Sequence, residues 1–118
     1  SEFLPERSHK LQRLGEMIQE AIDEGESILV FTQFAEIGAA LEKYLKHQHY
    51  RTYYLHGGTA RAKRETMIAE FQDPGTEPAI FILSIKAGGV GITLTKANHV
   101  FHFDRWWNPA VEDQATDR

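Results

Sequence analysis

The amino-acid sequence predicts an α/β domain of three layers, in which helices cover both faces of a mostly parallel β-sheet. Two observations lead to this class. Segments whose apolar residues recur at helical spacing alternate along the chain with short, continuously apolar runs. These runs lack the polar alternation of a strand with one wet face, so both faces of the predicted strands are expected to be buried. The 118 residues suffice for one such domain, 1–118, and we expect no second one.

A first helix is expected between Pro5 and Gly25, where the glycine ends the helical pattern. Its apolar positions follow helical spacing: Leu11, Leu14, Ile18 and Ile22. The run from Ser27 to Phe31 then predicts a strand, because it is short and its last four residues are all apolar. The chain therefore begins with a helix that leads directly into a buried strand.

The middle of the chain repeats this order. Ile37, Leu41 and Leu45 recur at helical spacing and predict a second helix. The run from Thr52 to Leu55 predicts a second strand, which ends at His56 and two following glycines. Helix and strand thus alternate a second time.

The remaining elements are a third helix and two more strands. The helix ends at the Asp-Pro-Gly sequence of residues 73–75, which is a strong helix breaker. Its expected inner face consists of Met67, Ile68 and Phe71. The third strand is expected at Ala79–Leu83 and the fourth at His99–Phe103, with a glycine turn and a short apolar piece, Ile92–Leu94, between them.

Four polar or glycine-rich segments follow the four predicted strands. The carboxyl ends of parallel strands meet at one edge of the sheet, where ligands of such folds bind. The segments are Thr32-Gln33, His56-Gly57-Gly58, Ser84–Gly91 and Asp104–Pro109. We therefore expect the functional site at this edge.

The segment after the third strand is the most informative one. Gly88–Gly91 contains three glycines, so the backbone there can approach a ligand closely. Hydroxyls at Ser84, Thr93 and Thr95 and the charge of Lys86 add donors, a chemistry that suits a polyanion. The phosphate-loop pattern G-x-x-x-x-G-K-[ST] and the dinucleotide pattern G-x-G-x-x-G are both absent.

Composition excludes several classes of protein. With 42% hydrophobic and 25% charged residues the chain is typical of globular proteins, and no apolar stretch is long enough to span a membrane. The absence of cysteine excludes disulfides, a thiol nucleophile and cysteine metal sites, and we expect an intracellular location. The net charge of −4 does not favour nucleic-acid binding, but residues 84–109 carry a local charge of +2.

The ordered set of these motifs resembles the second RecA-like lobe of the Swi/Snf-type DNA-dependent ATPases, a branch of helicase superfamily two. The resemblance spans nearly the whole chain. It is carried by SHKL at residues 8–11, ILVFTQF at 28–34, YLHGGT at 54–59, SIKAGGVGITLTKANHVFHFD at 84–104 and RWWNPAVEDQATDR at 105–118. In the family, these segments correspond to the start of the lobe, motif four, the block after it, motif five, and a Trp-Asn-Pro block that continues into motif six.

The resemblance implies a RecA-like fold of the P-loop NTPase type and a role for each motif residue. Contacts to the DNA backbone are implied for Thr32, Gln33, His56, Gly57, Gly58, Ser84, Lys86 and Thr93. Contacts to ATP are implied for Gly89, Gly91, Gln114 and Arg118, of which Gln114 and Arg118 would be catalytic. Coupling of the two activities is implied for Trp106, Trp107 and Asn108.

The resemblance also implies the cofactors and partners. ATP with magnesium would be bound mainly by an absent first lobe, and no metal site is expected on this chain. The partners would be double-stranded DNA and the N-terminal RecA-like lobe of the same parent chain, without a membrane, and the fragment would be monomeric. Arg118 matches only the first arginine of motif six, so a truncated, isolated fragment is expected to be inactive. The location would be cytoplasmic, with the nucleoid, in a prokaryote and nuclear in a eukaryote.

Each functional assignment has a structural alternative. Thr32 is also suited to cap a helix, and the glycines after His56 to form a sharp loop with left-handed dihedral angles. Arg61, Lys63 and Arg64 could extend a DNA track, although a charged helix face is usually only solvated.

Two pairs of polar residues suggest other chemistry. His47 and His49 are more typical of a solvated helix end than of a metal site, because no third ligand lies near them in sequence. His102 and Asp104 alternate on one side of a strand like an acid–base pair, but no nucleophile accompanies them.

Two other functions compete with a DNA motor. An RNA helicase lobe shares the same core, and the Trp-Trp-Asn-Pro sequence favours the duplex-DNA branch by resemblance. A non-catalytic α/β protein-binding module, receiver-like or rhodanese-like, lacks support, because the clustered acidic residues of the first and the cysteine of the second are absent.

Overall fold

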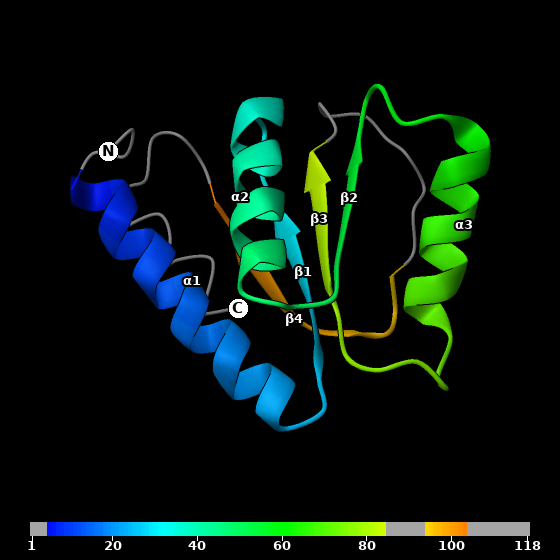
Figure 1. Cartoon of the computed structure of the whole chain (residues 1–118), viewed down its shortest axis with the longest axis horizontal. Coiled ribbons are helices and arrows are strands. Elements are labelled where there is room, and N and C mark those ends of the chain that lie inside the picture. Colours follow the sequence, from blue (N-terminus) through cyan, green and yellow to red (C-terminus); the bar gives the residue numbers. More distant parts are fainter. Residues whose placement is uncertain (1–4, 85–93, 104–118) are drawn as a thin grey trace.

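The computed structural model describes residues 5–84 and 94–103, which form three helices and four strands (Figure 1). The helices are α1 (Pro5–Asp23), α2 (Ala35–His47) and α3 (Arg61–Gln72). The strands are β1 (Ser27–Phe31), β2 (Thr52–His56), β3 (Ile80–Ser84) and β4 (Ala97–His102). Helix and strand alternate as predicted from α1 to β3.

The four strands form one sheet in the order β2-β3-β1-β4, and every pairing is parallel. In the central pair, Leu29 of β1 lies opposite Phe81 of β3. Helices α1 and α2 lie on one side of the sheet and α3 on the other, as Figure 1 shows. The predicted three-layer α/β fold is thereby confirmed.

The core consists of two apolar layers, one on each face of the sheet. Side chains of consecutive strand residues point to opposite faces, so Ile28 and Val30 pack toward α1 and α2 while Leu29 packs toward α3. The same division holds in β3, all of whose residues are buried. The continuous apolar runs therefore follow from helices on both faces.

Several strand boundaries differ by one or two residues from the sequence prediction. β3 extends to Ser84, one residue beyond the predicted end. β4 begins at Ala97 instead of His99, because a register shift lets Ala97 pair with Ser27 while His99 already pairs with Ile28. The side chain of the extra residue, Asn98, accepts the Ser27 N–H at 3.2 Å. This side-chain hydrogen bond takes the place of a backbone hydrogen bond between β1 and β4, and the pattern of apolar residues does not reveal it.

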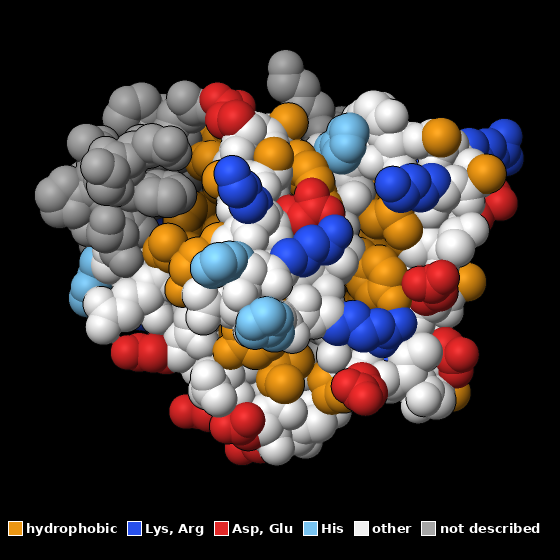
Figure 2. All heavy atoms as spheres, in the orientation of Figure 1, with side chains coloured by type: hydrophobic (Ala, Val, Ile, Leu, Met, Phe, Trp, Pro, Cys, Tyr) orange, Lys and Arg blue, Asp and Glu red, His pale blue; other side chains and the backbone are white. Residues whose placement is uncertain are grey.

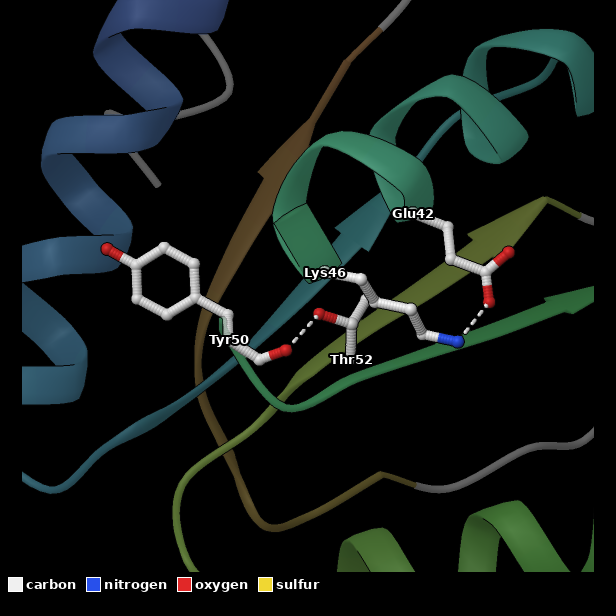
Figure 3. Close-up of polar contacts among 4 residues, drawn as sticks. All are labelled: Glu42, Lys46, Tyr50 and Thr52. Atoms are coloured by element: carbon white, nitrogen blue, oxygen red, sulfur yellow. Dashed lines mark hydrogen bonds and ion pairs between the residues drawn. The ribbon is translucent and has the colours of Figure 1, made fainter. Parts of the chain in front are cut away.

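The end of α2 is joined to the start of β2 by a tight turn (Figure 3). His49 occupies it with a positive φ of 70°, and the Tyr50 N–H donates to the carbonyl of Leu45 at 3.1 Å. The Thr52 hydroxyl then donates to the Tyr50 carbonyl at 3.0 Å. Both His47 and His49 are exposed, as expected for a solvated helix end.

Substitution by alanine is predicted to have opposite effects on stability at two helical glycines, Gly15 and Gly38. A Cβ on Gly38 of α2 would lie 2.4 Å from Cε1 of Tyr54, whereas a Cβ on Gly15 of α1 would meet nothing within 4 Å among the described atoms outside its chain neighbours and the adjacent backbone of its own helix. Gly15→Ala should raise the free energy of unfolding by about 0.5–1 kcal/mol, because alanine restricts the unfolded chain and favours the helix.

Gly38→Ala should lower that free energy, because overpacking costs about 1–3 kcal/mol and exceeds the gain in helix propensity. Urea unfolding of the two variants beside the wild-type chain measures both effects. Equal stabilisation by the two substitutions would show that the Tyr54 ring does not occupy the space above Gly38.

Candidate functional site

The carboxyl edge of the sheet brings together three of the four predicted segments. Ser84, the last residue of β3, lies opposite His56 at the end of β2. On its other side, the backbone N–H of Thr32 donates to the carbonyl of Leu83 at 3.1 Å. The residues that follow β1, β2 and β3 therefore meet at one place, as the sequence predicts.

Thr32 forms the buried floor of this edge. Its residue surface is only 4% exposed, and its hydroxyl accepts the N–H of Phe34 at 3.3 Å. Phe34, not Thr32, is the N-cap of α2, so the alternative of a threonine cap is wrong in its position. The hydroxyl stabilises the turn before the helix instead. Gln33, between the two, is exposed.

The loop after β2 holds His56 in one orientation. The His56 N–H donates to the Thr59 hydroxyl, and the Thr59 N–H donates back to the His56 carbonyl, both at 3.0 Å. The Gly58 N–H donates to Nδ1 of the His56 ring, also at 3.0 Å. Because Nδ1 is an acceptor, a neutral His56 carries its proton on Nε2, and Nε2 can donate a hydrogen bond to an anion.

Gly57 has no reason within the described chain to be glycine. Residues 56–59 form a tight loop, as the structural alternative expects, but only Gly25 among the described glycines has a positive φ, so Gly57 and Gly58 do not adopt the left-handed conformation. No described atom lies within 4 Å of a Cβ built on Gly57, whereas one on Gly58 would lie 3.1 Å from the His56 ring. Gly57 is exposed, so its backbone is open to close approach by another molecule.

Tyr54 is the contributor to this edge that the sequence analysis missed. Its hydroxyl donates to the carbonyl of Ala35, in the first turn of α2, at 2.7 Å. Burial raises the pKa of Tyr54 above 10.0, and the nearby carboxylates of Glu42 and Glu36 raise this pKa further against the opposing effect of Ser84. Ser84 itself is 6% exposed.

The end of β4 completes the edge. His102 is exposed and its ring stacks on Phe31 of β1 at 5.3 Å between centroids. The Phe103 N–H donates to the Phe31 carbonyl at 2.7 Å. Asp104, proposed as the partner of His102, lies outside the described residues.

A buried lysine joins α1 to the same region. Lys10, from the SHKL sequence at the start of the predicted lobe, is 3% exposed. Its Nζ lies 5.6 Å and 5.8 Å from the ring centroids of Phe101 and Phe103, within range of a cation–π interaction. The sequence alone does not reveal this contact, because Lys10 and the two phenylalanines lie on elements that are far apart in the chain.

The charges of the domain are distributed unevenly. In Figure 2, Lys and Arg side chains lie across the middle and the upper right of the face shown, and Asp and Glu side chains gather mainly toward its lower margin. Arg61 and Lys63 are exposed in the first turn of α3, next to the His56 loop, and Arg61 pairs only loosely with Glu65 at 3.7 Å. Such an exposed pair contributes little to stability.

Lys96 does not contribute its charge to the carboxyl edge. Its Nζ donates to the carbonyl of Asp73 and to the hydroxyl of Thr76, both at 2.7 Å, beyond the end of α3. The Lys96 N–H also donates to the Gln72 side chain at 2.9 Å. The local charge of +2 counted from the sequence is therefore not all available at the candidate site.

The remaining predicted site residues lie outside the described residues. They are Lys86, Gly89, Gly91, Thr93, Trp106, Trp107, Asn108, Gln114 and Arg118. Within residues 5–84 and 94–103, no group of three or more His, Asp or Glu side chains is arranged to hold a metal ion. No helix in the same part of the chain has the length and apolarity needed to cross a membrane.

Comparisons with known protein families, sequences and structures agree on one family. The model of a family described as helicase conserved C-terminal domain matches residues 9–118. YwqA of Bacillus subtilis (strain 168), whose name assigns it provisionally to the ATP-dependent helicases/translocases, is 44% identical over 123 residues, a match that covers 100% of this chain and 13% of YwqA. The chain thus spans a small part of the length of this relative.

Two solved structures share the fold. The Sulfolobus solfataricus SWI2/SNF2 ATPase C-terminal domain is 44% identical with a TM-score of 0.71, over 88% of this chain and 46% of that chain. The Sulfolobus solfataricus SWI2/SNF2 ATPase core in complex with dsDNA is also 44% identical with a TM-score of 0.71, over 92% of this chain and 22% of that chain.

The phenols of Tyr53 and Tyr54 predict a loss of stability at high pH. The pKa of Tyr53, like that of Tyr54, is raised above 10.0 by burial, with a further contribution from Glu70. Between pH 10.0 and these raised values the folded chain holds more protons than the unfolded chain, so stability is fully present below pH 10.0 and falls as pH rises.

The fall is measured by urea unfolding at pH 9, 10 and 11. A double variant, Tyr53→Phe with Tyr54→Phe, should lose less of its stability over this range than the wild-type chain does. Equal losses in the two proteins would contradict the assignment of the pH dependence to these phenols.

Proposed function

The chain belongs to the family of helicase conserved C-terminal domains, and we propose that it is the second motor lobe of an ATP-dependent double-stranded-DNA translocase of the Swi/Snf type. In this role the lobe grips the DNA backbone and contributes to ATP hydrolysis at a cleft shared with a first lobe. The similarity to a Swi2/Snf2 core bound to double-stranded DNA supports duplex DNA as the substrate.

The observation that carries this proposal is the open backbone of Gly57 beside the oriented ring of His56. Neither a positive φ nor a contact with the described residues requires glycine at position 57, and close approach of a ligand is the role that we propose for it. The amides of this loop and the Nε2 donor of His56 are sequence-independent partners for a phosphate. Such contacts suit a motor that moves over any base sequence.

The exposed and the buried residues of the edge have different roles in this proposal. Gln33, His56 and Gly57 offer accessible polar groups to the backbone, while Thr32 and Ser84 have little accessible surface and hold the floor. Direct contact of Thr32 and Ser84 with the DNA backbone stays a prediction. Lys86 and Thr93 would extend the same track.

The second part of the proposed mechanism is the contact with ATP. The first lobe would bind ATP with magnesium, and this chain would reach the nucleotide through Gly89, Gly91, Gln114 and Arg118. The aromatic sequence at residues 106–108 would transmit closure of the cleft to the DNA grip. ATP can drive this closure only if these residues contact it better in the closed state than in the open state.

The proposal is tested on a full-length protein that carries this lobe. Hydrolysis of ATP should rise on addition of double-stranded DNA, and the isolated 118-residue chain should show none. Turnover by the isolated chain above background would contradict the need for a first lobe, and a full-length protein indifferent to DNA would contradict the translocase.

Arg118→Ala separates the two proposed activities. In the full-length protein it should lower the rate of ATP hydrolysis by about a hundredfold, because one donor to the reacting phosphate is lost, while DNA affinity stays nearly unchanged. The control is Lys43→Ala, at an exposed position of α2 that is not among the proposed contact residues. Equal loss of hydrolysis and DNA binding in Arg118→Ala would remove Arg118 from the ATP site.

Gly57→Ala tests the carboxyl edge directly. Stability should not change, because the added methyl group meets no described atom, but DNA affinity should fall about three- to tenfold as the methyl group displaces the backbone phosphate. The slope of log affinity against log salt should decrease by about one, the effect of one lost phosphate contact.

Gly75→Ala is the matched control, since Gly75 is an exposed glycine beyond the far end of α3. It should alter neither DNA affinity nor the salt slope. If Gly57→Ala binds DNA like the wild-type protein, the loop after β2 does not approach the backbone.

A further inference from the structure

We propose that Tyr54 is a positioning residue that fixes the first turn of α2 to β2, so that the proposed DNA-contacting segments after β1 and β2 act as one rigid unit. This inference rests on the proposed function and adds to it a residue for which neither the sequence motifs nor the comparisons give a role.

The hydroxyl of Tyr54 links two elements. Tyr54 belongs to β2, two residues before His56, and its hydroxyl donates to the Ala35 carbonyl in α2 at 2.7 Å. His56 in turn lies opposite Ser84 of β3 in the sheet. One phenol therefore joins the start of α2, which follows the Thr32-Gln33 segment, to the strand that carries His56.

The packing around the Tyr54 ring allows its hydroxyl to reach the start of α2. The ring lies over Gly38, where any side chain would collide with it, since a Cβ would lie 2.8 Å from the phenolic oxygen and 2.4 Å from Cε1. On its other side the ring contacts His56 at 4.9 Å between centroids. Movement of the phenol would therefore disturb both the start of α2 and the His56 ring.

The hydroxyl and the ring of Tyr54 contribute separately to the fold. The ring packs against the core on the α1 and α2 side of the sheet, and phenylalanine would supply the same apolar contact. Only the hydroxyl bonds to Ala35, so its removal should loosen the edge while the core is kept. Fixing several contact groups in their bound geometry reduces the entropy lost on binding, and this is the expected benefit for DNA affinity.

Tyr53 provides a matched control one residue away. Its side chain lies on the opposite face of the sheet, against the α3 layer, and its hydroxyl donates to Glu70 at 3.1 Å. Tyr53→Phe makes the same chemical change as Tyr54→Phe but breaks no link at the carboxyl edge. A general effect of losing a phenolic hydroxyl would appear in both variants.

The experiment compares Tyr54→Phe and Tyr53→Phe in a full-length protein that carries this lobe. Hydrogen exchange of the amides of Ile37 and Gly38, which both donate to the Phe34 carbonyl, reports the first turn of α2 without DNA. DNA-stimulated ATP hydrolysis gives the half-saturating concentration of DNA and the maximum rate. Tyr54→Phe should speed exchange at these amides and raise the half-saturating DNA concentration about three- to tenfold, more than it lowers the maximum rate.

Every other outcome overturns the inference. Unchanged exchange in Tyr54→Phe would show that the hydroxyl does not fix α2, and faster exchange with an unchanged half-saturating concentration would show that the link does not serve DNA binding. The same shifts in Tyr53→Phe would indicate general loosening. A wild-type protein without DNA stimulation would defeat the proposed function itself, whereas the exchange data would still decide whether the link exists.

Discussion

The parallel pairing of β1 with β3 is the interaction on which the rest of the structure depends. It matches Ile28–Phe31 with Ile80–Leu83, and all but Phe31 of these residues are buried between helices on both faces. The ladder continues past the strand, where the Thr32 N–H still donates to the Leu83 carbonyl. Because this buried pairing sets the register, Thr32 and Ser84 lie side by side at the carboxyl edge of the sheet.

The carboxyl edge is built in two levels as a consequence. The buried hydroxyl of Thr32 and the partly buried phenol of Tyr54 form hydrogen bonds within the protein, where unpaired polar groups would be costly. Above them, Gln33 and Gly57 are exposed. A rigid lower level that carries accessible polar groups is the arrangement that a backbone grip without base recognition requires.

The sequence predicted the elements of this fold well, because continuous apolar runs such as Ile28–Phe31 follow directly from burial on two faces. The start of β4 could not be predicted, since the Asn98 side chain replaces a ladder bond that the apolar pattern does not encode. Tyr54 and Lys10 were missed for a related reason. Their partners, Ala35 for one and the two β4-end phenylalanines for the other, are brought near only by the tertiary fold.

The acidic net charge is compatible with a DNA motor because of where the charges lie. Glu24, Glu26 and Glu77 lie in the turns at the amino edge of the sheet, and Lys96 is bound there too. Arg61 and Lys63 lie near the carboxyl edge instead. With only these cations near the carboxyl edge in the described part of the chain, we expect the proposed grip to engage few phosphates and to be weak. Weakness is an advantage in this mechanism, because a lobe that must release and rebind DNA in each cycle can use only the difference in affinity between its two states.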